Sequence, residues 1–135
     1  MSRLVLCHGV FDILHVGHFE HFRAARAYGD QLIVSVTAAR WVRVAKGAGH
    51  PAHSDEERTA MLRDLRIVDE VWLCDDPTGV PAILLFRPTY YVKGADYLAP
   101  GVKDPEFQAC VAVGARIVYT PTRKRSVMDM VKAFA

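Results

Sequence analysis

The chain has 135 residues, 51% of them hydrophobic, and a formal net charge of +2. This length predicts one domain, residues 1–135, with a buried core, and the small charge gives no electrostatic case for a nucleic-acid partner. No apolar stretch has the length of a membrane span, which excludes a membrane protein, and three scattered cysteines without a signal peptide indicate a reducing, cytoplasmic compartment.

Short apolar runs alternate with helix-like segments along the chain. The expected strands are residues 3–7, 31–37, 70–73, 90–93 and 116–119. The expected helices are residues 19–28, 54–66, 78–86, 104–113 and 126–134. Ser54 and Glu57 have the spacing of a capping box, Asp104-Pro105 suits a helix start, and Gly114 suits a helix end.

This alternation predicts an α/β fold, a single-domain, Rossmann-like, doubly wound five-stranded parallel sheet with right-handed crossovers. Ligands of such sheets bind outside the carboxyl ends of the strands. Several polar side chains follow strands or open helices, and we expect them at that edge: His8, Asp12, His15, His18, Arg58, Lys93 and Ser126.

The junction between the first strand and the first helix carries the sequence Gly-Val-Phe-Asp-Ile-Leu-His-Val-Gly-His, residues 9–18. Free N–H groups and the positive dipole end make a helix N-terminus an anion site. We therefore predict His15 and His18 as catalytic donors to phosphate oxygens. The segment also supplies predicted nucleotide-binding residues, although Phe11 suits the core and Asp12 suits a turn: Gly9, Val10, Phe11, Asp12 and Gly17.

No metal ligands are predicted, because the zincin pattern is absent around His18 and His21, and His21 is expected at the surface. Lys46 is predicted on a mobile loop, as a clamp on the phosphates. Arg58 lies on the apolar stripe of its helix near the carboxyl edge, where it would bind phosphate or only snorkel.

Two later segments complete the predicted nucleotide site. Lys93, Gly94 and Asp96 follow the fourth strand, where the lysine suits a phosphate and the aspartate suits ribose or base. Arg123 and Ser126 open the last helix and suit the β- and γ-phosphates, although a solvated loop is the alternative.

The His-x-Gly-His segment resembles the signature of the cytidylyltransferase-like nucleotidyltransferases. The resemblance extends along nearly the whole chain, and residues 75–78 and 92–97 are most similar to the heptose-1-phosphate adenylyltransferase branch. It implies transfer of a nucleoside monophosphate, with ATP favoured, to a sugar 1-phosphate, with release of pyrophosphate, Mg²⁺ bound mainly through the nucleotide phosphates, and a homodimer. It also implies that His15 and His18 contact the reacting phosphates and that Lys46 assists the transition state.

The chain departs from the family pattern at two places, where Ser126-Val127-Met128 replaces a Ser-Thr-Thr-like run and His50-Pro51 replaces an Arg-Pro. One alternative is therefore a cytidylyltransferase that uses CTP and glycerol 3-phosphate or another phospho-alcohol. Another is a nucleotide-binding module without catalysis. A dinucleotide oxidoreductase is disfavoured, because Gly-x-Gly-x-x-Gly is absent after the first strand.

Overall fold

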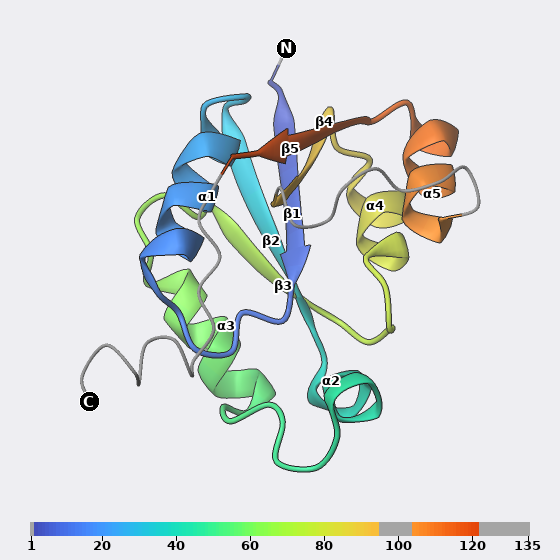
Figure 1. Cartoon of the computed structure of the whole chain (residues 1–135). Helices are drawn as coiled ribbons and strands as arrows, with labels where there is room; N and C mark the ends of the chain where they lie inside the picture. The colour runs from blue at the N-terminus through green and yellow to red at the C-terminus, as the bar shows by residue number, and fades with distance from the viewer. Residues whose placement is uncertain (1, 95–103, 122–135) are drawn as a thin grey trace.

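A computed structural model of the chain describes residues 2–94 and 104–121 and shows one parallel sheet with helices on both faces (Figure 1). Its strands are β1 Leu4–Gly9, β2 Gln31–Thr37, β3 Glu70–Cys74, β4 Tyr90–Gly94 and β5 Arg116–Thr120. Its helices are α1 Val16–Arg26, α2 Ala39–Lys46, α3 Asp55–Arg63, α4 Val80–Phe86 and α5 Pro105–Val113.

The five strands are all parallel and lie in the order β3-β2-β1-β4-β5. The predicted Rossmann-like sheet is therefore confirmed. The chain runs outward from β1 to β3, returns to the other side of β1, and continues to β5. The topological switch thus lies between β1 and β4, and ligands of such sheets bind there, beyond the carboxyl ends.

Side chains of β1 alternate between two buried layers, as the pleat of a strand requires. Val5 and Cys7 pack with Phe22 of α1 and Leu62 of α3. Leu6 packs on the opposite face, in the layer under α4 and α5. Figure 1 shows α1 and α3 on one side of the sheet and α4 and α5 on the other. The central strand is covered on both faces, which agrees with its apolar run Leu4 to Cys7.

The boundaries of several helices differ from the prediction. The helix after β1 begins at Val16 rather than Phe19, and α3 ends at Arg63 instead of reaching residue 66. Lys46, predicted on a mobile loop, is instead the last residue of helix α2, Ala39–Lys46. Gly47 ends this helix with φ of 93°, so the glycine-rich sequence begins only after it. The predicted helix 126–134 lies outside the described residues.

The caps at two helix starts agree with the prediction. Ser54 and Glu57 exchange side-chain and backbone hydrogen bonds of 3.0 and 3.1 Å at the start of α3. The carboxylate of Asp104 accepts from the N–H of Glu106 at 2.8 Å at the start of α5, and Gly114 ends that helix.

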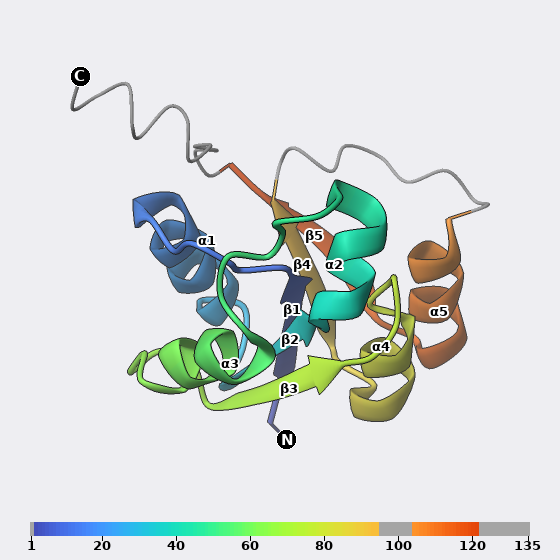
Figure 2. The same cartoon turned by 90° about the horizontal axis from the view of Figure 1, so that it is seen from below.

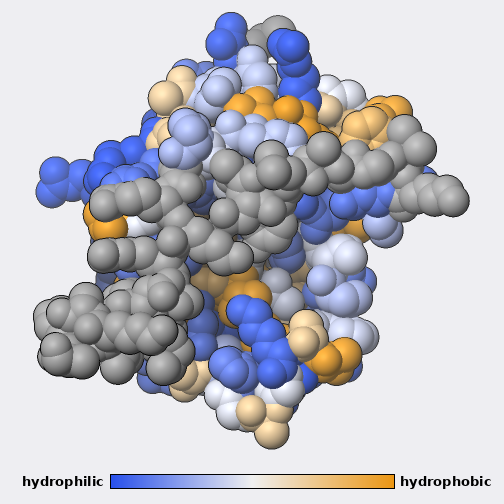
Figure 3. Space-filling view, in the orientation of Figure 1, coloured by the Kyte–Doolittle hydropathy of each residue, from blue (hydrophilic) through white to orange (hydrophobic). Residues whose placement is uncertain are grey.

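The described surface is mixed in character, and all three cysteines are buried. Figure 3 shows hydrophobic patches separated by hydrophilic residues on one face. None of the helices in the described ranges is long and apolar enough to cross a bilayer. Cys7, Cys74 and Cys110 are all buried as free thiols, as predicted for small core residues.

Replacement of Phe22 tests the layer beneath α1. This side chain has no exposed surface, so Phe22→Ala is expected to lower the free energy of unfolding by about 3–5 kcal/mol through lost burial and a cavity. Leu85→Ala on the exposed face of α4 is the control and is expected to change it by less than about 1 kcal/mol. Urea unfolding measures both, and equal losses would contradict this assignment of the core.

Candidate functional site

The start of α1 is a capping box built from two histidines. His15 is the N-cap residue, and its Nδ1 accepts the backbone N–H of Gly17 at 3.0 Å. In return, Nδ1 of His18 accepts the backbone N–H of His15 at 3.1 Å. A histidine nitrogen accepts a hydrogen bond only when it carries no proton. Both neutral rings therefore carry their proton on Nε2, the atom farther from the backbone.

The two rings form a pair at the carboxyl edge of the sheet, with centroids 4.1 Å apart. Burial, with smaller contributions from His15 and His21, lowers the pKa of His18 to about 4. His18 is therefore uncharged at neutral pH. Two N–H donors held by a reciprocal cap at a helix N-terminus are suited to bind an anion without rearranging.

The residues that precede this cap fix the loop. Phe11 has φ of 48° and packs its ring 5.2 Å from that of Phe22 and 5.8 Å from that of His18. A Cβ at Gly9 would lie 2.8 Å from Cζ of Phe11, so the strand end needs a glycine to admit this ring. The expected core position of Phe11 is confirmed, with only 8% of the residue exposed.

Asp12 connects this loop to the segment before α3. Its carboxylate oxygens accept the backbone N–H groups of Ala52 and His53 at 2.6 and 2.8 Å. In this structure, Asp12 therefore orders two loops, which agrees with the structural role expected for it at a turn.

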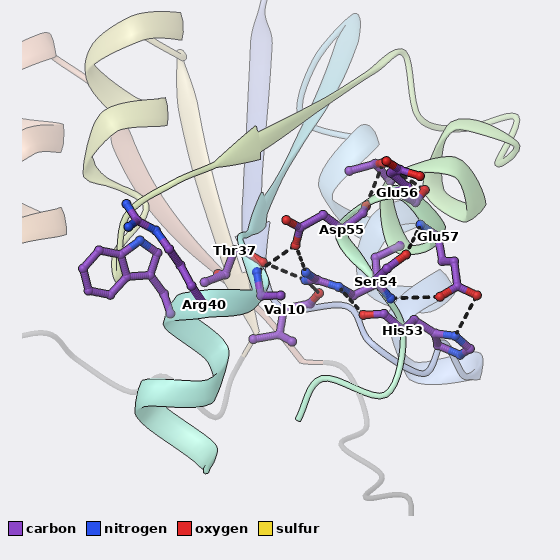
Figure 4. Close-up of polar contacts among 12 residues, drawn as sticks. Val10, Thr37, Arg40, His53, Ser54, Asp55, Glu56 and Glu57 are labelled. Carbon is purple, nitrogen blue, oxygen red and sulfur yellow. Dashed lines mark hydrogen bonds and ion pairs between the residues drawn. The ribbon is translucent and has the colours of Figure 1, made fainter. Parts of the chain in front are cut away.

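Arg58 lies at the carboxyl edge, as its position on the helix predicted, and its surroundings give it a structural role. The guanidinium has no exposed surface. It donates to the carbonyl oxygens of Val10, Thr37 and His53 at 3.0, 2.7 and 3.1 Å and to the carboxylate of Asp55 at 2.6 Å. Figure 4 shows these partners converging from separate segments. Arg58 therefore joins loops in this structure, and its phosphate contact stays a prediction.

The other candidate residues are exposed, lie at the end of β4, or fall outside the described residues. Lys46 is exposed at the end of α2, which Figure 2 shows from the carboxyl side of the sheet. Lys93 and Gly94 end β4, and the ammonium of Lys93 lies 2.9 Å from a carboxylate oxygen of Glu106. Asp96, Arg123 and Ser126 lie outside the described residues.

The structure shows contacts of two polar residues, His8 and Glu106, that sequence reasoning did not predict. His8, expected at this edge without a role, places Nδ1 2.9 Å from the hydroxyl of Ser35 and Nε2 3.2 Å from that of Thr37. Burial lowers its pKa. Glu106 had only the signal of an acidic residue in a first helical turn, which does not reveal its partner on β4.

His21 differs from its expected surface position. It is half-buried, and its Nδ1 lies 2.8 Å from the hydroxyl of Thr120 at the end of β5. Burial lowers the pKa of this histidine too. Its spacing on α1 gave no sign of this contact, because the partner lies on the last strand.

In the ranges 2–94 and 104–121, no group of three or more His, Cys, Asp or Glu side chains is placed to hold a metal ion. Mg²⁺ often keeps several waters and binds through substrate phosphates with few protein ligands.

Comparison with known proteins supplies a family. A family profile described as Cytidylyltransferase-like matches residues 6–131. The bifunctional protein HldE of Koribacter versatilis (strain Ellin345) is 39% identical over 105 residues, covering 78% of this chain and 22% of that protein. HldE of Pseudomonas syringae pv. syringae (strain B728a) is 45% identical over 98 residues, covering 71% and 20%. The chain thus spans about a fifth of the length of these relatives.

A solved structure shares the fold. The lipopolysaccharide core biosynthesis protein from Thermoplasma volcanium GSS1 superposes with a TM-score of 0.74 at 23% identity, covering 92% of this chain and all of that one. At this identity the likeness supports the fold alone.

Replacement of Arg58 separates its observed role from a phosphate contact. Arg58→Met would remove the guanidinium from three carbonyl oxygens and leave the Asp55 carboxylate with only the N–H of Ala39 among the described residues, and we expect it to destabilise the protein by about 3–5 kcal/mol. Arg63→Met, on the exposed side of the same helix, is the matched control. An Arg58→Met protein that unfolds like wild type but binds nucleotide poorly would instead support the phosphate assignment.

The low pKa of His18 makes stability depend on pH with a defined sign. Between about pH 6.5 and 4 the unfolded chain binds a proton at this residue that the folded protein does not, so stability falls as the pH falls through that window. His18→Asn removes this contribution while His8 and His21 remain. We expect a smaller decrease of Tm from pH 7 to 4.5 in the variant than in wild type; parallel curves would contradict the lowered pKa.

Proposed function

Because the chain belongs to the cytidylyltransferase-like family of nucleotidyltransferases, we propose that it transfers the AMP moiety of ATP to a sugar 1-phosphate, similar to heptose 1-phosphate, and releases pyrophosphate. The observation that carries the proposal is the pair of neutral Nε2–H donors of His15 and His18 at the start of α1. The similarity to bifunctional HldE proteins and the segment at 92–97 support the acceptor class.

In the proposed reaction, an oxygen of the acceptor phosphate attacks the α-phosphorus of ATP while the bond to the β-phosphate oxygen breaks. Pyrophosphate leaves in line with the attack, and no covalent enzyme intermediate forms. Negative charge grows on the oxygens around the α-phosphorus, and His15 and His18 would donate hydrogen bonds to them. Their cap fixes the rings before the substrate arrives, so little reorganisation accompanies the reaction.

Further contacts are part of the same proposal. The exposed ammonium of Lys46 would reach the phosphates from α2. Backbone at Gly9, Val10 and Gly17, with Gly94, would line the nucleotide site. Asp96, Arg123 and Ser126 stay predicted contacts, since they lie outside the described residues.

Mg²⁺ bound to the triphosphate would neutralise part of its charge and orient the leaving group. It would be held mainly by the phosphates. We propose residues 1–135 as one nucleotidyltransferase domain that acts as a homodimer. The free thiols of the three cysteines support a reducing, cytoplasmic compartment.

Two substitutions at His18 separate the cap from the donor. His18→Asn keeps an acceptor near the position of Nδ1 but removes the Nε2–H, so we expect kcat to fall by about 10²–10³ with little change in Tm. His18→Gln keeps an N–H near the position of Nε2, and its amide oxygen can accept the N-cap N–H as Glu57 does in α3, so we expect it to retain more activity than His18→Asn. The reverse ranking would contradict the proposed donor role.

The substrate assay measures pyrophosphate release with Mg²⁺, crossing ATP, CTP, GTP and UTP with sugar 1-phosphates, glycerol 3-phosphate and other polyol phosphates. Turnover with ATP and a sugar 1-phosphate, abolished or strongly reduced in His18→Asn, is the expected result. Turnover with CTP and a polyol phosphate would assign the protein to the alternative branch. Nucleotide binding without any turnover across the panel would favour the non-catalytic module.

A further inference from the structure

A second charged cluster lies at the carboxyl edge, on the side covered by α4 and α5. The ammonium of Lys93 at the end of β4 lies 2.9 Å from Oε1 of Glu106, in the first turn of α5. Only 14% of each side chain is exposed. The phenol of Tyr91 donates to the same oxygen at 2.8 Å, and the backbone N–H of Gly79 donates to the other oxygen at 2.8 Å.

The position of the Glu106 carboxylate is fixed by groups other than the lysine. Gly79 has no room for a side chain, since a Cβ there would lie 2.7 Å from Oη of Tyr91 and 2.9 Å from Cγ of His8. Its N–H is therefore held against the carboxylate. Burial alone would raise the pKa of Glu106, but hydrogen bonds from Gly79, Lys93 and Tyr91 outweigh it and lower that pKa, so the group is ionised at neutral pH.

This ion pair is not explained by stability. A buried pair loses the hydration of both charges, and replacement by packed apolar side chains is often neutral or stabilising. A lysine is also a long, flexible chain, and the loss of side-chain entropy opposes holding it in one position. A fixed lysine at a ligand-binding edge therefore points to a role in binding.

The place of Lys93 in the sheet brings it toward the first loop. β4 pairs with β1, with Leu6 opposite Tyr91. The pairing ends there; Lys93 lies two residues beyond Tyr91 on β4, and His8 lies two residues beyond Leu6 on β1, just before Gly9. The charges of Lys93 and Glu106 both act on His8, which agrees with this placement. Lys93 thus lies across the topological switch from the His15–His18 pair.

We propose that Glu106 is a positioning residue, whose carboxylate fixes the ammonium of Lys93 at the carboxyl edge so that Lys93 binds the nucleotide. The inference rests on the proposed function and deepens it. Glu106 itself touches no substrate. It offsets part of the charge of Lys93, so the lysine acts as a hydrogen-bond donor of fixed direction rather than as a mobile cation.

The test is a double-mutant cycle read by binding of a non-hydrolysable ATP analogue, with no acceptor present. Lys93→Met is expected to weaken binding by about tenfold or more, the loss of one hydrogen bond from a charged donor. Glu106→Gln keeps one acceptor oxygen, for the N–H of Gly79, and places a neutral amide where Oε1 faces Tyr91 and Lys93, so it is expected to weaken binding severalfold. In the Lys93→Met background the same change is expected to have less than about a twofold effect, because Glu106 acts through the lysine.

Matched measurements separate positioning from folding and from net charge. Glu56→Gln, at an exposed position on α3, removes the same charge and is expected to leave binding unchanged. In steady-state kinetics, we expect Lys93→Met and Glu106→Gln to raise KM for the nucleotide more than they lower kcat. We expect KM for the acceptor to stay unchanged. Wild-type nucleotide affinity in Lys93→Met, equal losses for Glu106→Gln in both backgrounds, or a rise in the acceptor KM alone would overturn the inference.

His18→Asn in the same assays distinguishes failure of this inference from failure of the proposed function. If His18→Asn loses turnover while Lys93→Met binds and reacts normally, only the role of Lys93 and Glu106 is wrong. If the wild-type protein binds no nucleotide, the proposed function and this inference fall together.

Discussion

The buried guanidinium of Arg58 is the interaction on which the carboxyl edge of the sheet depends. It joins the chain just after β1, through Val10, to the end of β2, through Thr37. A charge with no exposed surface is tolerated only because Asp55 lies 2.6 Å away and three carbonyl oxygens complete its shell. The loop that leads into α1 is therefore placed by a side chain of α3, on the same face of the sheet. Neither hydrophobic layer contains these polar contacts, so packing alone would not fix this loop.

Once the loop is placed, its own residues define where α1 begins. Phe11 adopts a left-handed backbone conformation that is unfavourable for a bulky side chain, and packing against Phe22 compensates for it. Asp12 holds the facing loop by two backbone N–H groups. The N-cap then falls on His15, and its exchange of hydrogen bonds with His18 turns Nε2 of each ring away from the backbone. The geometry proposed for phosphate binding thus follows from contacts that involve no ligand.

The sequence predicted those features that short patterns encode. Apolar runs, the caps at Ser54 and Asp104, and the residues at the first strand–helix junction all depend on neighbours within a few positions. Arg58 shows where such reasoning ends. Its helical spacing placed it at the correct edge, but its partners are carbonyl oxygens 21 and 48 residues away, and no side-chain pattern marks a backbone carbonyl as an acceptor. The pairing of Lys93 with Glu106 and of His21 with Thr120 was hidden for the same reason, since each forms only when the sheet has assembled.

The two charged anchors give the site its electrostatic character. Arg58 on the α1 and α3 side and Lys93 on the α4 and α5 side are each held beside a carboxylate, and the lowered pKa of His18 leaves the proposed donor at the start of α1 uncharged. For a nucleotidyltransferase this matters, because attraction that is equal for substrate, transition state and pyrophosphate does not accelerate the chemical step. Neutral donors in fixed positions favour the arrangement of oxygens around the reacting phosphorus rather than negative charge in general. In the proposed reaction, such a site would select by geometry, and its affinity for the departing pyrophosphate would be lower than that of a cluster of unpaired cations.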